Sequence, residues 1–150
     1  MSTSSDRLTR ETVHGPALAV RVCLCLLILV SGLALRGFGF DLGLPALVVK
    51  YGGSALWAAM VFFLVAIAAS HLPRPTIALI SMSIAVAVEL FRLVHAPWLD
   101  AFRLTLAGAL LLGRIFSLWN MLAYGVGIVL AMGLDRLGMR ACTPTPHSAK

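Results

Sequence analysis

One stretch of this chain combines membrane-like hydrophobicity with ionisable side chains: VELFRLVHAPWLDAFRLTLAGALLLGRIFSLWNMLAY, residues 88–124. Its apolar sequence is interrupted by polar residues that include Glu89, Arg92, His95, Asp100, Arg103, Asn120 and Tyr124. Ionisable groups are costly inside a bilayer and therefore mark functional positions there more often than surface charges do. We predict that any site of this protein lies in this stretch.

The composition of the whole chain is that of a membrane protein. Of its 150 residues, 60% are hydrophobic and only 12% are charged, which exceeds what a soluble domain of this size can bury. Backbone groups in a bilayer must bond to one another, so long apolar runs predict helices of about 20 residues. The predicted fold is an all-α bundle of four transmembrane helices, with an interfacial or re-entrant helix between the third and the fourth.

Helix-breaking residues separate four apolar segments. The segments are residues 17–35, 51–70, 76–94 and 117–134. The HLPRP sequence at residues 71–75 holds two prolines, which cannot continue a helix, so the second and third helices are predicted to be antiparallel neighbours. The start of residues 98–116 is too polar to span a membrane, whereas residues 104–112 are too apolar for a simple loop. Whether residues 104–112 enter the membrane stays open.

The ends of the chain are more polar than its middle. Residues 1–16 are predicted to form a flexible N-terminal tail, residues 17–134 the transmembrane domain, and residues 135–150 a disordered C-terminal tail. Seven basic residues fall on the side of both termini: Arg7, Arg10, Arg21, Arg74, Arg136, Arg140 and Lys150. Five fall on the opposite side: Arg36, Lys50, Arg92, Arg103 and Arg114. The excess of positive charge predicts that both termini are cytoplasmic.

Several functional classes are disfavoured. The net charge of +6 does not indicate nucleic-acid binding, because the basic residues are scattered at helix ends instead of gathered on one face. The sequence has no zinc-binding spacing, phosphate-binding loop, dinucleotide glycine pattern or HExxH motif, so no cofactor and no metal are predicted. His95 and Asp100 have no recognisable serine or cysteine nucleophile beside them, and we expect no enzymatic activity.

Four antiparallel spans bring distant polar residues to one membrane surface. The start of the second segment, the end of the third and the start of the fourth meet there, so Ser54, Glu89, Arg92 and Asn120 are predicted to converge in depth. Arg92 follows Glu89 by three residues, which places the two on one helical face and predicts an ion pair. Two interpretations remain open: a pair that only orients the helix, or a site for a lipid, a headgroup or a proton.

Two further groups of residues lie near this surface. His95, Asp100 and Arg103 are predicted to form a second polar cluster just outside the membrane core. The aromatic residues are expected to be interfacial anchors more than a substrate cage; they are Trp57, Trp98, Trp119 and Tyr124.

Several short sequences carry a family resemblance. They are KYGGSALW at 50–57, VEL at 88–90, HAPWLDAFR at 95–103, FS at 116–117 and NMLAY at 120–124. Over residues 17–134 the chain resembles a bacterial family known as domain of unknown function 2809, which is itself VanZ-like. The resemblance implies a multi-pass protein of the bacterial cytoplasmic (inner) membrane with a role in the cell envelope. The family has no assigned activity to transfer.

The chain departs from the family pattern at its polar positions. Typical members have Asp where Ser54 stands, Glu-x-x-Gln where Glu89 and Arg92 stand, and Asp where Asn120 stands. Two acids are therefore absent, which weakens a metal, cationic-substrate or proton role and strengthens the ion pair as the explanation of Glu89.

These observations lead to one principal hypothesis and two alternatives. The hypothesis is that a lipid or cell-envelope-precursor headgroup binds at an extracytoplasmic polar cleft formed by Ser54, Glu89, Arg92, His95, Asp100, Arg103 and Asn120. The alternatives are a small proton-coupled transporter and a structural or assembly partner of another membrane protein. The expected partners are membrane lipids, with a second membrane protein or further copies of this chain as other candidates, and no nucleic acid.

Overall fold

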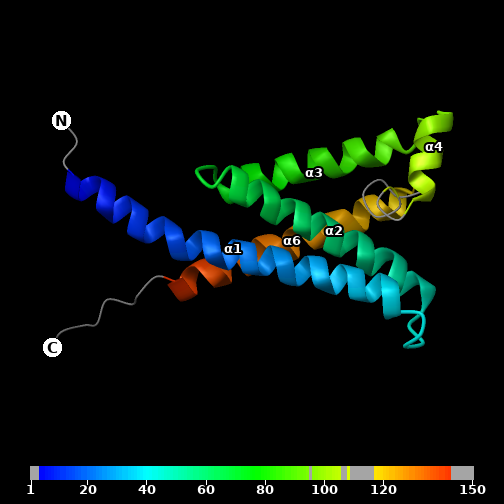
Figure 1. Ribbon diagram of the computed structural model, residues 1–150, viewed down its shortest axis with the longest axis horizontal. Coiled ribbons are helices and arrows are strands. Elements are labelled where there is room, and N and C mark those ends of the chain that lie inside the picture. Colours follow the sequence, from blue (N-terminus) through cyan, green and yellow to red (C-terminus); the bar gives the residue numbers. More distant parts are fainter. Residues whose placement is uncertain (1–3, 95, 106–107, 109–116, 143–150) are drawn as a thin grey trace.

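The fold is a bundle of long helices (Figure 1). The computed structural model describes the backbone of residues 4–94, 96–105, 108 and 117–142. Within these ranges it describes the side chains of residues 15–140. Within them lie four long helices, α1 (Ser4–Phe38), α2 (Ala46–Ala68), α3 (Arg74–Phe91) and α6 (Leu118–Cys142), and a short one, α4 (Pro97–Leu104). The four long helices have the length and apolar composition needed to cross a membrane. The chain is therefore an all-α, multi-pass membrane protein, as its composition predicts.

The helices at the two ends of the chain are longer than the apolar segments predicted from the sequence. Helix α1 begins at Ser4, so residues 4–16 are helical. Helix α6 likewise continues past residue 134 to Cys142. Pro16 lies inside α1 without ending it, and the extension of α6 contains no proline. Residues 1–3 and 143–150, which complete the predicted tails, lie outside the described residues.

Helix α2 is the centre of the bundle. It packs against α1, α3 and α6, whereas α6 packs against α1 and α3 as well. The beginning of α1 and the end of α6 lie at the same end of the bundle (Figure 1), as an even number of spans requires. We call this the terminal end, and we call the opposite end, where α1 and α3 stop and α2 and α6 start, the α4 end.

The crossing of α2 and α6 depends on a glycine. A Cβ atom added to Gly127 would lie 2.1 Å from the carbonyl oxygen of Ala55, a distance that no carbon atom tolerates. The backbones can approach this closely only because Gly127 has no side chain, which is a common way to pack helices in membranes. The contact holds the first half of α2 against the first half of α6.

Short connections set the direction of the helices. Gly43 has a φ of 73° in the turn between α1 and α2, a left-handed conformation that glycine adopts without strain. Pro73 precedes α3 and Pro75 lies in its first turn, where a missing N–H costs nothing. Helices α2 and α3 are therefore antiparallel neighbours, as the two prolines predict.

Candidate functional site

The side chain of Glu89 is the centre of a polar cluster at the α4 end. Glu89 lies in the last turn of α3 and is 0% exposed. Its Oε1 accepts hydrogen bonds from the Ser117 backbone N–H at 2.7 Å and from Asn120 Nδ2 at 3.2 Å. Its Oε2 accepts one from the Tyr124 hydroxyl at 2.7 Å and one from Arg92 Nη1. Four donors thus compensate for the desolvation of this carboxylate.

These contacts join α3 to the beginning of α6. Ser117 precedes α6, and the positive end of the helix dipole favours a carboxylate at this position. Arg92, the residue that follows α3, forms the predicted ion pair with Glu89. In this pair the guanidinium is the one charged donor to the Glu89 carboxylate among the described residues, and the other three donors are neutral groups.

The cluster extends to α2 through an amide. The Ser54 hydroxyl lies 3.4 Å from Asn120 Oδ1, and Asn120 Nδ2 donates to Glu89. Ser54, Glu89, Arg92 and Asn120 therefore form one connected group. The structure brings together the four residues that antiparallel topology places at one depth.

The predicted cluster of His95, Asp100 and Arg103 is separate from the Glu89 cluster, and its described contacts join α4 to the end of α3. Arg103 lies in α4, forms an ion pair with Asp100 at 3.0 Å, and donates to the carbonyl oxygens of Val94 and Phe91 at 2.9 and 2.7 Å. Cations commonly satisfy the free carbonyl groups at a helix C-terminus. Arg103 thus fastens α4 to the end of α3. The third predicted member, His95, lies outside the described residues.

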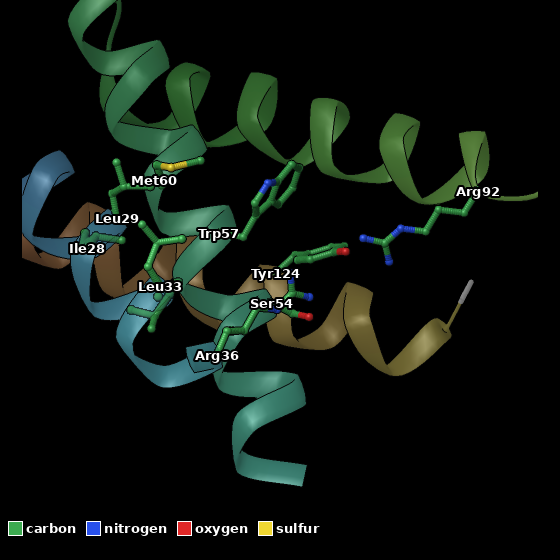
Figure 2. A pocket seen from close by; sticks show the side chains of 12 residues that line it. Ile28, Leu29, Leu33, Arg36, Ser54, Trp57, Met60, Arg92 and Tyr124 are labelled. Atoms are coloured by element: carbon green, nitrogen blue, oxygen red, sulfur yellow. The ribbon is translucent and has the colours of Figure 1, made fainter. Parts of the chain in front are cut away.

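A pocket of about 330 Å³ adjoins the Glu89 cluster (Figure 2). It lies at the lower end of the range of small-molecule sites, about 300–1,000 Å³. Helices α1 and α2 provide most of its walls, and Arg92 and Tyr124 reach it from α3 and α6. Its lining consists of Ile28, Leu29, Gly32, Leu33, Arg36, Gly53, Ser54, Leu56, Trp57, Met60, Arg92 and Tyr124. Of the residues that the structure describes, Asp100 and Arg103 do not line the pocket.

The pocket is polar at one end and apolar at the other. Figure 2 shows the side chain of Arg92 pointing toward Tyr124, while Ile28, Leu29 and Met60 gather at the far end. Arg36 approaches from α1 and passes over Gly53, where an added Cβ would lie 3.8 Å from Arg36 Nε. Two guanidinium groups therefore border an otherwise largely aliphatic and aromatic cavity.

The aromatic residues divide into two groups. Trp98 and Trp119 are 70% and 67% exposed, which suits contact with lipid or its interface. Trp57 and Tyr124 instead pack on each other, with ring centroids 5.6 Å apart, and both line the pocket. The prediction that all four are interfacial anchors is wrong for Tyr124, which is buried and bonded to Glu89.

A second buried carboxylate, which the sequence did not single out, lies at the terminal end. Asp135 is 1% exposed and pairs with Arg21 at 2.8 Å and Arg74 at 2.6 Å. Arg21 also donates to the carbonyl oxygen of Ala66 at 2.8 Å. These contacts join all four long helices. Arg21 is buried in this cluster. The signal for the cluster in the sequence is that Asp135 is the one acid after the last apolar segment.

The comparisons with known proteins agree with the resemblance in the sequence. Residues 43–128 match the family model described as a protein of unknown function, DUF2809. No solved structure matches the chain. The matched region starts after α1, so it is shorter than residues 17–134, over which the resemblance extends; it includes the whole Glu89 cluster but not Arg36. Because the match covers more than half of the chain, this protein belongs to the DUF2809 family of proteins of unknown function.

Proposed function

We propose that this protein binds a membrane lipid, or a lipid-linked cell-envelope precursor, with the headgroup at the α4 end of the pocket. The observation that carries the proposal is the distribution of side chains around the cavity. Two arginines, Arg36 and Arg92, border one end, and the walls beyond them are apolar. An amphiphile with an acidic headgroup matches this arrangement, because its headgroup would face the arginines and its apolar chain would face the apolar walls.

The depth of the pocket fits a lipid in its own leaflet. Arg36 is two residues from the end of α1, and Arg92 follows the end of α3, so both lie near a membrane surface. Ile28 lies ten residues before Phe38, which at 1.5 Å per residue is about 15 Å deeper. That depth is about half of a hydrocarbon core of about 30 Å. A bound acyl chain would therefore run from the surface toward the midplane beside α1 and α2.

The charge distribution of the chain suggests which leaflet is involved. The balance of basic residues favours both termini in the cytoplasm, and the α4 end is opposite the termini (Figure 1). The proposed ligand then belongs to the extracytoplasmic leaflet.

The two alternatives have less support. A proton-coupled transporter needs a carboxylate that gains and loses a proton during the cycle, whereas Glu89 already accepts four hydrogen bonds, one of them from a guanidinium. Exposed apolar residues on α1 would suit an assembly partner, but they equally suit lipid.

The proposal can be tested by native mass spectrometry of protein extracted from its membrane in a mild detergent. Leu33 lines the pocket and is 45% exposed, whereas Val30 lies on the same helix, is 62% exposed and does not line it. Leu33→Trp should fill the cavity, and Val30→Trp is the matched control. We expect wild type and Val30→Trp to retain lipid and Leu33→Trp to lose most of it. Equal retention by both variants, or no retained lipid in wild type, would contradict the proposal.

A further inference from the structure

We infer that the pocket opens sideways into the hydrocarbon core of the membrane, between α1 and α3, and that its ligand enters through this opening. The inference rests on the proposed function and adds the route of the ligand and its class: an amphiphile that already resides in the bilayer, not a water-soluble acid. It follows from the contacts between the helices and from the exposure of the side chains that border the pocket.

Helices α1 and α3 are the two long helices that do not touch. In the part of the chain that the structure describes, every other pair among the four long helices is in contact, whereas α1 and α3 do not contact each other. Figure 1 shows α2 passing between them. The side of α2 that lies between its two neighbours is therefore not sealed by a contact of α1 with α3.

The stripe of α2 that borders the pocket continues onto the lipid-facing surface of the bundle. Gly53, Trp57 and Met60 line the pocket, and their spacing of four and three residues places them on one helical face. Leu64 lies one turn further along this face and is 50% exposed, whereas Val61 to Phe63 are buried. The pocket is therefore a hollow in the outer surface over α2, not a closed internal cavity.

The rim of the pocket on α1 lies at the depth of acyl chains. Leu33 and Leu29 line the pocket and are 45% and 39% exposed. They precede Phe38, the end of α1, by five and nine residues, which at 1.5 Å per residue places them roughly 8 and 14 Å below that end. Because the hydrocarbon core is about 30 Å thick, these side chains face acyl chains and not water. A ligand that passes over this rim comes from the bilayer.

A side opening determines which part of an amphiphile the pocket holds. The headgroup lies at the end bordered by Arg36 and Arg92, and the upper part of one acyl chain lies against Trp57 and Met60. The remainder of that chain continues over the exposed Leu64 into the bilayer. A closed pocket would reject long chains, because overpacking is destabilising, whereas an open one has no such limit. The pocket should thus bind by headgroup and upper chain, without selecting for chain length.

The native Trp57 reports on the opening through its fluorescence. The chain has three tryptophans, and the other two, Trp98 and Trp119, are exposed, so Trp98→Phe/Trp119→Phe leaves Trp57 as the single one. This variant is reconstituted as the full chain in phosphatidylglycerol vesicles whose acyl chains are either brominated or not, because bromine quenches indole fluorescence only at short range. We expect brominated chains to quench most of the Trp57 emission and iodide in the water to quench little of it. Quenching by iodide alone, or by neither agent, would overturn the side opening.

A matched pair of variants locates the route on α1. In the background with Trp57 alone, Leu29→Phe/Leu33→Phe narrows the opening. Leu26→Phe/Val30→Phe makes the same change at the same spacing, at positions that are 55% and 62% exposed and do not line the pocket. All four positions are exposed, so neither variant disturbs the core. The first variant should lose much of the quenching by brominated chains and the second should keep it; equal quenching in the two would overturn the route beside α1.

Native mass spectrometry then separates this inference from the proposed function. Phosphatidylglycerols with short and long acyl chains, at equal concentrations, should be retained equally by wild type, and a strong preference for one length would overturn the open side. Lipid that is retained by wild type and lost in Leu33→Trp, together with quenching of Trp57 by iodide alone, would support the proposed function and overturn this inference. No retained lipid in wild type would overturn the proposed function, and with it the entry of a ligand, whatever the quenching shows.

Discussion

Two buried carboxylates at opposite ends of the bundle are compensated in different ways. Asp135 at the terminal end contacts two guanidinium groups, from Arg21 and Arg74. Glu89 at the α4 end contacts one guanidinium group, from Arg92, and three neutral donors. Both are essentially inaccessible to solvent, and both connect several helices.

The two clusters also differ in whether a partner of the acid faces a cavity. Arg21 uses Nε and Nη2 for Asp135 and Nη1 for Ala66, and its side chain is buried. In the Asp135 cluster the buried Arg21 guanidinium therefore bonds to other helices of the bundle. The Glu89 cluster borders the pocket through Arg92 and Tyr124. Under the proposed function, the acid whose buried partner Arg21 is fully used by protein groups has a structural role, and the acid whose partner Arg92 faces a cavity suits binding.

The largest expected effect is that of removing the acid at the terminal end. Asp135→Ala leaves Arg21 buried without its counter-ion, which typically costs about 3–5 kcal/mol. Thermal unfolding in detergent should show a large decrease in midpoint. The double variant Asp135→Ala/Arg21→Met removes both charges and should recover much of the loss. Asp41→Asn, in the exposed turn after α1, is the control, and an Asp135→Ala midpoint equal to that of the control would contradict the structural role.

The next largest effect concerns the crossing between the two clusters. Gly127→Ala forces a Cβ against the Ala55 carbonyl, and overpacking of this kind typically costs about 1–3 kcal/mol. Because α2 and α6 contribute to both clusters, heat stability and lipid retention should fall together. Gly125→Ala, where an added Cβ meets nothing within 4 Å, should leave both unchanged. A Gly127→Ala protein as stable as the Gly125→Ala protein would show that the helices cross less closely.

An effect similar in size to that of Gly127→Ala, and smaller than that of Asp135→Ala, is expected at the α4 end. Glu89→Gln keeps the shape of the side chain but turns one acceptor into a donor, so one of its four partners loses its bond. Loss of a hydrogen bond to a buried charged group typically costs about 1.5–3 kcal/mol. The midpoint of thermal unfolding should fall by less than in Asp135→Ala. A larger fall would mean that the Glu89 cluster, too, mainly fastens the bundle.

The smallest effect should follow from neutralising the exposed acid of α4. Asp100 pairs with Arg103, but its side chain is 48% exposed, and exposed ion pairs contribute about 0–1 kcal/mol. Arg103 keeps its bonds to Val94 and Phe91, so Asp100→Asn should hardly alter the unfolding midpoint or the retained lipid. A clear loss of lipid in this variant would bring Asp100 back into the binding site.

Much of the fold could be predicted from local sequence. Apolar runs of about 20 residues can satisfy their backbone groups in a bilayer only as helices, and the prolines around residue 74 end one helix and start the next. The i, i+3 spacing of Glu89 and Arg92 likewise predicts their ion pair without knowledge of other helices.

The candidate site could be predicted in part. Antiparallel topology brings Ser54 and Asn120 to the depth of Glu89, and the structure connects them. For Trp57 and Tyr124 the sequence predicts a place at the membrane interface instead, because composition cannot distinguish an aromatic residue that faces lipid from one that faces another helix. The sequence predicts for Arg36 only a contribution to the positive charge of the side opposite the termini, although Arg36 borders the pocket.

The sequence by itself determined the number of spans, their alternating direction and the local ion pair, because these depend on hydrophobicity and on spacing along one helix. Only the tertiary structure decided that Asp135 meets Arg21, more than one hundred residues away, and that Arg36 and Arg92 border the same cavity. The rotation and crossing of helices set such contacts. Those depend on close packing at positions such as Gly127, which no periodicity in a single helix reveals. The stretch at residues 88–124 supplies most of the polar cluster, and packing against α1 and α2 makes it part of a pocket.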